Sequence, residues 1–167
     1  MKTEKEKMIS GEYYNAFDPE LLKGRRAAKN LLHSLNVKEY TYYDYDTKGL
    51  NEEAMFAELA TVPAGDVVLV HACCHNPSGM DLTFAQWQRF TDIAKERGFT
   101  PLVDMAYQGF GTGLDEDAKG LRYLADNVDE MILCSSCSKN CGLYRERIGA
   151  VSIVAVDSKV ADVAKVN

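Results

Sequence analysis

The sequence predicts an α/β fold with a mainly parallel sheet and flanking helices, preceded by a short helical segment. From Val37 onward, short runs of β-branched and aromatic residues alternate with stretches whose apolar residues recur at helical spacing. Such alternation is typical of a layered α/β domain, in which helices connect neighbouring parallel strands. Residues 1–36 lack these runs. We therefore expect two parts, residues 1–36 and residues 37–167.

The N-terminal part is expected to be helical. In "DPELLKGRRAAKNLLHSL", residues 18–35, Asp18 can cap a helix and Pro19 suits its first position. The helix would have a basic outer face. Its apolar residues recur at helical spacing, at Leu21, Leu22, Ala28, Leu31, Leu32 and Leu35.

The second part is expected to contain five strands and four helices. Thr83 and Gln86 form a capping-box pattern, and Gly98 stands where a helix would stop. The expected strands are "VKEYTYYD" (37–44), "DVVLVH" (66–71), "TPLVDM" (100–105), "MILCSS" (131–136) and "IGAVSIVA" (148–155). The expected helices are residues 51–59, 83–97, 115–125 and 158–166.

Composition and charge exclude several classes of function. The 167 residues are 46% apolar and 26% charged, which is ordinary for a globular domain. The net charge is -6 and no basic run occurs, so we expect no nucleic-acid or membrane partner. No apolar stretch approaches the roughly 20 residues that span a bilayer. The start, "MKTEKEKMIS", lacks the apolar core of a signal peptide, so we expect a cytoplasmic protein.

The cysteines indicate reduced thiols and no metal site. Five cysteines in an intracellular chain favour free thiols over disulfides. The "HACCH" cluster, residues 71–75, suggests zinc, but adjacent strand residues point to opposite faces and no second ligand pair follows at a zinc-finger distance. We interpret the cluster as small thiols and packing histidines.

Polar residues gather after three of the expected strands, where α/β domains place their chemistry. The groups are residues 71–79, 104–107 and 135–147. The last, "SSCSKNCGLYRER", contains Lys139, either a solvated surface ammonium or an amine kept dry to act as a nucleophile. Between Asp104 and Lys139 there is room for one helix and one strand, so both can face one bound molecule.

Three of these stretches resemble a known family. "HACCHNPSGMDLTFAQW", "PLVDMAYQGFGTGLDEDAKGLR" and "SSCSKNCGLYRERIGA" are similar to the aspartate and aromatic amino-acid aminotransferases, pyridoxal-phosphate enzymes of fold type I. The resemblance runs from about Val37 to the end. It implies part of the large domain of that fold, and transfer of an amino group between an amino acid, aspartate or aromatic, and a 2-oxo acid.

The resemblance also implies roles for six residues. Lys139 would form the Schiff base with pyridoxal phosphate, and Asp104 would keep the pyridine nitrogen protonated. Tyr107 and Asn76 would hydrogen-bond the phenolic oxygen, and Ser136 and Arg147 would bind the phosphate. "HNPSG" is a turn pattern in which Asn76-Pro77 can be a cis bond.

The residue types suit these roles without the family. Burial and a nearby cation such as Arg147 lower the pKa of a lysine from its usual value of about 10.4 and make the amine nucleophilic. A carboxylate such as Asp104 stabilises a pyridinium, and an arginine fork matches phosphate oxygens. Each residue also has an ordinary structural alternative: surface lysine, helix-capping aspartate, core tyrosine or ion-paired arginine.

The sequence also departs from the family. Cys137 and Cys141 stand where the family commonly has aromatic residues. Family members are more than twice as long, and their glycine-rich phosphate loop, ring-stacking aromatic residue and substrate-binding arginine cannot be placed here. Substrate choice therefore cannot be read. A second interpretation is a truncated or chimeric non-catalytic domain that folds, binds pyridoxal phosphate weakly and can form a homodimer.

The first 36 residues have a different resemblance. They are similar to the N-terminal helical segment of maltose and galactoside O-acetyltransferases, with a junction expected near Ser34–Val37. A third interpretation, sugar acetyl transfer, rests on this segment and lacks the hexapeptide repeats of those enzymes. The residues that carry it are Met8, Gly11, Tyr14, Asp18, Leu22, Arg26, Ala28, Leu32 and Asn36.

Overall fold

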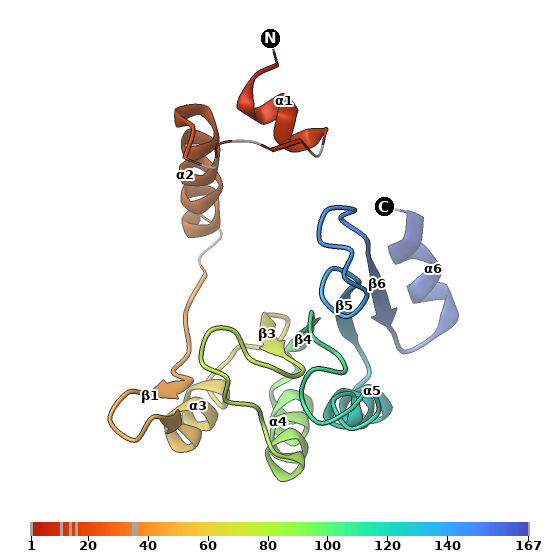
Figure 1. Ribbon diagram of the computed structural model, residues 1–167. Helices are drawn as coiled ribbons and strands as arrows, with labels where there is room; N and C mark the ends of the chain where they lie inside the picture. Colours follow the sequence, from red (N-terminus) through yellow and green to blue (C-terminus); the bar gives the residue numbers. More distant parts are fainter. Residues whose placement is uncertain (1, 11, 14, 16, 35–36, 167) are drawn as a thin grey trace. The chain divides into compact units, whose positions relative to one another are not determined.

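The computed structural model describes residues 2–10, 12–13, 15, 17–34 and 37–166 (Figure 1). The chain divides into two compact units, Met1–Glu39 and Tyr40–Asn167. Within the described ranges, no helix is both long enough and apolar enough to cross a membrane. The expected boundary between residues 36 and 37 stays a prediction from the sequence.

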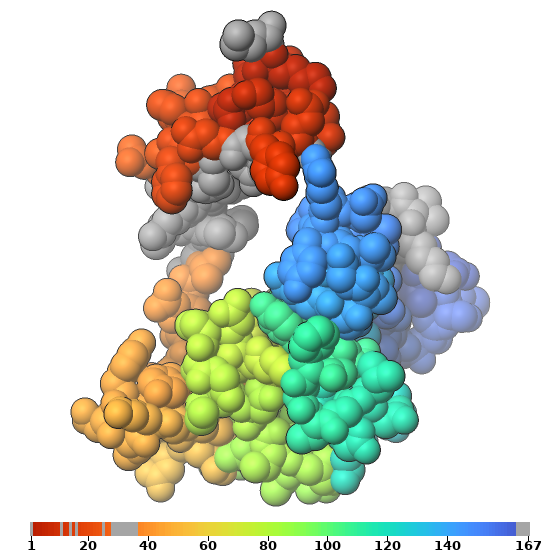
Figure 2. Space-filling model, in the orientation of Figure 1, coloured from red at the N-terminus to blue at the C-terminus, as the bar shows by residue number. Residues whose placement is uncertain are grey.

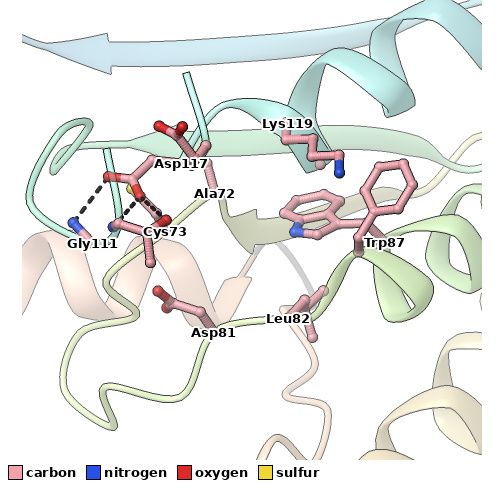
Figure 3. A pocket seen from close by; sticks show the side chains of 12 residues that line it. Ala72, Cys73, Asp81, Leu82, Trp87, Gly111, Asp117 and Lys119 are labelled. Carbon is pink, nitrogen blue, oxygen red and sulfur yellow. Dashed lines mark hydrogen bonds between the residues drawn. The ribbon is translucent and has the colours of Figure 1, made fainter. Parts of the chain in front are cut away.

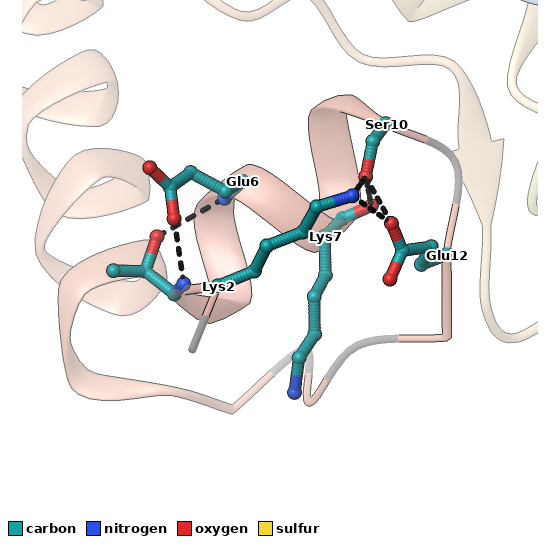
Figure 4. A network of polar contacts seen from close by, with 6 residues as sticks. Lys2, Glu6, Lys7, Ser10 and Glu12 are labelled. Atoms are coloured by element: carbon teal, nitrogen blue, oxygen red, sulfur yellow. Dashed lines mark hydrogen bonds and ion pairs between the residues drawn. The ribbon is translucent and has the colours of Figure 1, made fainter.

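The first unit contains two helices. Helix α1, Glu4–Ile9, begins with a capping box in which Thr3 and Glu6 exchange hydrogen bonds of 2.8 and 3.1 Å. Next to this helix, the exposed Lys2 side chain contacts Ser10 and Glu12 (Figure 4).

Helix α2 is Pro19–Ser34, and the expected cap is confirmed because Asp18 Oδ1 accepts the Glu20 amide at 2.9 Å. The junction expected near Ser34–Val37 includes residues 35–36, which lie outside the described residues, as do Leu35 and the side chains of Ala28, Leu31 and Leu32.

A four-stranded sheet organises the second unit. Its order is β3-β4-β5-β6, with β3 (Val67–His71), β4 (Thr100–Met105) and β5 (Met131–Ser136) parallel. Strand β6 (Gly149–Val154) runs antiparallel to β5. The expected mainly parallel sheet is therefore confirmed. Since parallel strands end at the same edge, the loops after β3, β4 and β5 begin close together.

Helices cover one face of this sheet (Figure 1). They are α3 (Glu52–Leu59), α4 (Phe84–Arg97) and α5 (Lys119–Asn127), with α6 (Ser158–Val166) following β6. The capping box of Thr83 and Gln86 is present, and Gly98 adopts the left-handed conformation, with φ of 71°. Both expected helix signals are confirmed. The core between these layers includes Phe56, Val68, Val70, Trp87, Phe90, Val103, Leu121, Leu124 and Met131.

Two expected elements differ from the structure. The strand expected at residues 37–44 is wrong except at β1 (Tyr43–Asp44), which pairs antiparallel with β2 (Gly49–Leu50). The preceding residues are irregular because the Thr41 amide is taken by Glu58 Oε2, at 2.7 Å. Two phenols there bind distant carbonyls: the Tyr40 hydroxyl donates to Leu69 O at 2.8 Å, and the Tyr42 hydroxyl to Met80 O at 2.6 Å.

The second difference concerns α5, which begins at Lys119 and not at Asp115. The residues before Lys119 form turns. Within them the Asp117 side chain accepts amides of the preceding loop and does not cap the helix.

Gly120→Ala tests the contact between α4 and α5. A Cβ built at Gly120 would lie 2.2 Å from Trp87 Cδ1, and Trp87 is only 3% exposed. The buried indole cannot move away easily, so we expect the free energy of unfolding in urea to fall by about 1–3 kcal/mol. Gly49→Ala is the matched control, because its nearest neighbour would be 3.7 Å away. Equal losses in the two variants would contradict this account of the packing.

Candidate functional site

A pocket of about 100 Å³ lies at the carboxyl ends of β3 and β4. Three of the predicted site residues line it: Asp104 within β4, Tyr107 just beyond that strand, and Asn76 in the loop after β3. His71, Cys73 and Ala106 complete the lining. In Figure 2 the segments that follow β3, β4 and β5 form adjoining yellow-green, green-cyan and blue surfaces.

Lys139 reaches this edge from the third loop. It follows β5, is partly buried, and holds its Nζ 5.8 Å from the centre of the Tyr107 ring. The same Nζ lies 4.6 Å from the centre of the Tyr144 ring. An ammonium near an aromatic face is attracted by the negative charge of the ring, and of these two rings only that of Tyr107 lines the pocket.

The turn that carries Lys139 is shaped by hydrogen bonds that two backbone amides donate, one to a side chain and one to a carbonyl. The Ser138 amide donates to Ser136 Oγ at 3.1 Å, and the Cys141 amide donates to Cys137 O at 3.3 Å. Lys139 therefore lies within one closed turn directly after a strand.

Ser136, Lys139 and Arg147 are not among the residues that line the pocket, although Lys139 lies beside it through its contact with Tyr107. Ser136 is the last residue of β5 and is paired with Gly149. Arg147 is exposed, its backbone is left-handed with φ of 54°, and its Nη1 donates to Tyr144 O at 3.4 Å. The structure thus brings Asn76, Asp104, Tyr107 and Lys139 together.

The loop after β3 is held by one carboxylate. Asp81 accepts the amides of Cys74 and His75, each at 2.8 Å. The His75 ring stacks on Tyr42 with centroids 4.0 Å apart, and burial, reinforced by His71, lowers the pKa of His75. The Asn76-Pro77 bond that follows is cis, as the turn pattern predicted.

Sequence reasoning missed His71 and Cys73 as pocket residues. The Nδ1 of His71 accepts the Asn76 amide at 3.3 Å, so this histidine supports the residue beside it as well as lining the pocket. One signal was visible: His71 ends the alternating run "DVVLVH", on the face opposite the buried Val68 and Val70. Among the described residues, no group of three or more His, Cys, Asp and Glu side chains could hold a metal ion.

Figure 3 shows a second pocket, of about 200 Å³. Ala72, Leu82 and Trp87 give it an apolar wall, and Asp81 and Asp117 contribute carboxylates. Cys73 lines both pockets, so the two share a wall.

The fold and the strand-end site together define the class of this chain, and comparison with known proteins identifies the family. A parallel α/β sheet carries a lysine, an aspartate, a tyrosine and an asparagine at one edge. Residues 31–166 match the family described as Aminotransferase class I and II, and the chain belongs to that family.

Individual relatives agree with this assignment. The aspartate aminotransferase of Salmonella typhi is 52% identical over 128 residues, which are 77% of this chain and 32% of that protein. A solved aromatic amino acid aminotransferase with 3-indolebutyric acid is 41% identical, with a TM-score of 0.79, over 84% of this chain and 36% of that one. A solved aromatic-amino-acid aminotransferase from Burkholderia pseudomallei, covalently bound to pyridoxal phosphate, is 44% identical with a TM-score of 0.71. The match covers 76% of this chain and 31% of that one.

These comparisons confirm the predicted family and the predicted fold type. They also show that the chain spans about a third of the length of the relatives it matches. The family match begins at residue 31, so the resemblance of residues 1–36 to sugar O-acetyltransferases stays a prediction.

The buried Cys73 should resist alkylation. Burial raises the pKa of its thiol to about 12, so the thiol is almost wholly protonated near pH 8, and only the thiolate is nucleophilic. We expect iodoacetamide to modify Cys73 on the order of 100-fold more slowly than the exposed Cys141, as measured by peptide mass spectrometry. Above pH 12 the difference between the alkylation rates of Cys73 and Cys141 should narrow. Comparable rates in the folded chain near pH 8 would show that Cys73 is accessible.

Proposed function

We propose that this chain carries pyridoxal-phosphate-binding groups of an aminotransferase that moves an amino group between an aspartate or aromatic amino acid and a 2-oxo acid. The observation that carries the proposal is the approach of Lys139 Nζ to Tyr107, beside the pocket that Asn76 and Asp104 also line. Family membership supports it, as do relatives named aspartate and aromatic-amino-acid aminotransferases.

The pocket residues fit the ring of pyridoxal phosphate. The Asp104 carboxylate would pair with a protonated pyridine nitrogen, and the Tyr107 hydroxyl and Asn76 amide would donate to the ring oxygen. Lys139 would bind the cofactor carbonyl through Nζ and, once free, carry the proton that leaves the substrate Cα. When bound, the cofactor supplies a cationic ring that withdraws the electrons left by that proton.

Ser136 and Arg147 are proposed to bind the phosphate. Ser136 ends β5 with a hydroxyl three residues before Lys139, and Arg147 offers a planar fork that matches phosphate oxygens. Because Arg147 is exposed and bonded to Tyr144 O, its guanidinium would exchange that carbonyl for the phosphate.

The alternative is a non-catalytic domain that folds and binds the cofactor weakly. It rests on one observation, with which it is consistent: the chain spans about a third of its relatives' length, and the residues described here supply groups for the cofactor side of the reaction. Sugar acetyl transfer has no support beyond the resemblance of residues 1–36. A homodimer and a cytoplasmic location stay predictions from the sequence.

Borohydride reduction tests the proposed role of Lys139. With added pyridoxal phosphate, we expect the reduced cofactor label on Lys139, because this residue is partly buried and its Nζ lies 5.8 Å from the centre of the Tyr107 ring, beside the pocket. Peptide mapping should find at least about tenfold less label on Lys95 and Lys119, and Lys139→Ala should lose the main site. Label spread evenly over these lysines would reject the proposal.

The same capture experiment tests Asp104. Asp104→Asn keeps the size of the side chain and removes its charge, so we expect capture to weaken about tenfold or more, since a hydrogen bond to a charged group contributes about 1.5–3 kcal/mol. Asp115→Asn is the matched control, because Asp115 is exposed and pairs with Arg122 at 2.9 Å. Equal capture of pyridoxal phosphate by both variants would contradict a cofactor-binding role for Asp104 and indicate a structural one.

A coupled assay separates the catalytic and non-catalytic interpretations. We expect the chain alone, with an amino acid, 2-oxoglutarate and saturating pyridoxal phosphate, to turn over well below the roughly 1–10³ per second of ordinary enzymes. The physical reason is that positioning a substrate over the cofactor contributes about 7–11 kcal/mol in favourable cases, and the groups that position it cannot be placed in this sequence. Turnover within the ordinary range would establish a complete active site and reject the non-catalytic alternative.

A further inference from the structure

Asp117 is a buried carboxylate whose contacts all point to one loop. It is 7% exposed and accepts five hydrogen bonds. One oxygen, Oδ2, accepts the amides of Gly109 at 2.8 Å and Gly111 at 3.0 Å. The other, Oδ1, accepts the Thr112 amide at 2.7 Å, the Thr112 hydroxyl at 3.3 Å and the Gly113 amide at 3.4 Å. A carboxylate offers about four lone-pair sites, so these donors occupy it fully.

The direction of the Asp117 side chain is unusual for its place in the chain. An aspartate just before a helix commonly caps that helix by accepting one of its first amides. Helix α5 instead has Ala118 at its cap position, with no side-chain hydrogen bond there. Figure 3 shows the Asp117 carboxylate turned toward Gly111, on the loop side. The carboxylate therefore organises the loop after β4 and not the helix.

A glycine in the loop allows the Asp117 carboxylate to approach the backbone closely. A Cβ built at Gly111 would lie 2.5 Å from Asp117 Oδ1, so only glycine permits the approach at that position. Burial would raise the pKa of Asp117, but the four backbone donors outweigh burial and lower it, so the group stays ionised at neutral pH. Charge-assisted hydrogen bonds of this kind are roughly twice as strong as neutral ones.

The same loop carries Tyr107 at its start. The Phe110 amide donates to Tyr107 O at 3.0 Å, closing the first turn of the loop, and the Gln108 side chain donates to Leu114 O at 2.9 Å. Gly109, which Asp117 binds directly, is two residues from Tyr107. Asp117 does not line the pocket that contains Tyr107. Its influence on Tyr107 must therefore pass through the backbone of the loop.

We propose that Asp117 is a positioning residue for Tyr107: its carboxylate clamps residues 109–113 against the start of α5 and so fixes the turn from which Tyr107 faces Lys139. The inference rests on the proposed function only where it concerns the cofactor. In the free chain its consequence is a rigid loop and a constant contact between Tyr107 and Lys139.

The first test uses the cofactor-free chain. In Asp117→Asn, which keeps the size and removes the charge, amide hydrogen exchange at Gly109, Gly111 and Thr112 should accelerate about tenfold or more, while Val103 in β4 keeps its protection. Asp115→Asn is the control, because that side chain is 82% exposed and lies in the same turn region. Unchanged exchange in the loop would overturn the clamp, and equal acceleration at Val103 would reduce Asp117 to a general stabilising role.

The second test asks whether Tyr107 itself responds. Lys139→Ala should shift the Tyr107 ring signals in NMR spectra of the free chain, and this shift should be at least halved when Asp117→Asn is also present. With pyridoxal phosphate added, the pH midpoint of the absorbance of the bound cofactor should move in Asp117→Asn, because a donor to its ring oxygen is misplaced. In a Tyr107→Phe background Asp117→Asn should cause no further movement.

The outcomes keep the two proposals apart. If the unmodified chain does not bind pyridoxal phosphate, the proposed function fails, and the exchange and ring-signal measurements still decide the role of Asp117. The inference is overturned if Asp117→Asn moves the pH midpoint of the cofactor absorbance equally in the Tyr107→Phe background. It is also overturned if Asp117→Asn does not change the shift of the Tyr107 ring signals caused by Lys139→Ala, because Asp117 then does not act through Tyr107.

Discussion

The parallel pairing of β3, β4 and β5 is the constraint on which the candidate site depends. It sets His71 beside Asp104 and Asp104 beside Cys134, so the loops that follow the three strands begin at one edge. A slip of β4 by one residue against its neighbours would turn Asp104 to the other face of the sheet. The register is maintained by apolar burial on the face of the sheet opposite His71 and Asp104, at Val70, Val103 and Met131, each burying apolar surface worth about 25 cal/mol per Å². Mutations in this core should therefore disturb the site without touching it.

Each of the three loops contains or adjoins a side chain that accepts backbone amides and helps to order it. Asp81 does this after β3, Asp117 after β4, and Ser136 after β5. Loops lack the regular hydrogen bonds of a sheet, and buried amides must find partners. A side-chain acceptor supplies the partner and at the same time selects one loop conformation. The strand ends thus determine where the candidate site lies, and the side-chain acceptors help to determine the loop conformations that orient the site's side chains.

Much of the fold could be predicted from sequence because its signals are local. The caps at Asp18 and Thr83 and the stop at Gly98 act over a few residues, and the apolar strands carry their own pattern. The strand expected at residues 37–44 was wrong because its aromatic residues do not pair in a sheet. Tyr40 and Tyr42 reach carbonyls far along the chain, and burial raises the pKa of Tyr40 to about 12 and that of Tyr42 further, so both remain hydrogen-bond donors.

For the site, sequence could identify residues but could not distinguish their environments. Asp104 and Asp117 are both aspartates in one short stretch, each next to a strand or helix boundary. Only the fold shows that Asp104 lines the smaller pocket, while Asp117, at the larger one, has its oxygens occupied by five donors. An occupied carboxylate has no lone pairs left for a ligand and can act only on the chain that surrounds it. The proposed binding role of Asp104 and the proposed positioning role of Asp117 thus rest on pocket lining and hydrogen-bond geometry, which residue type alone does not specify.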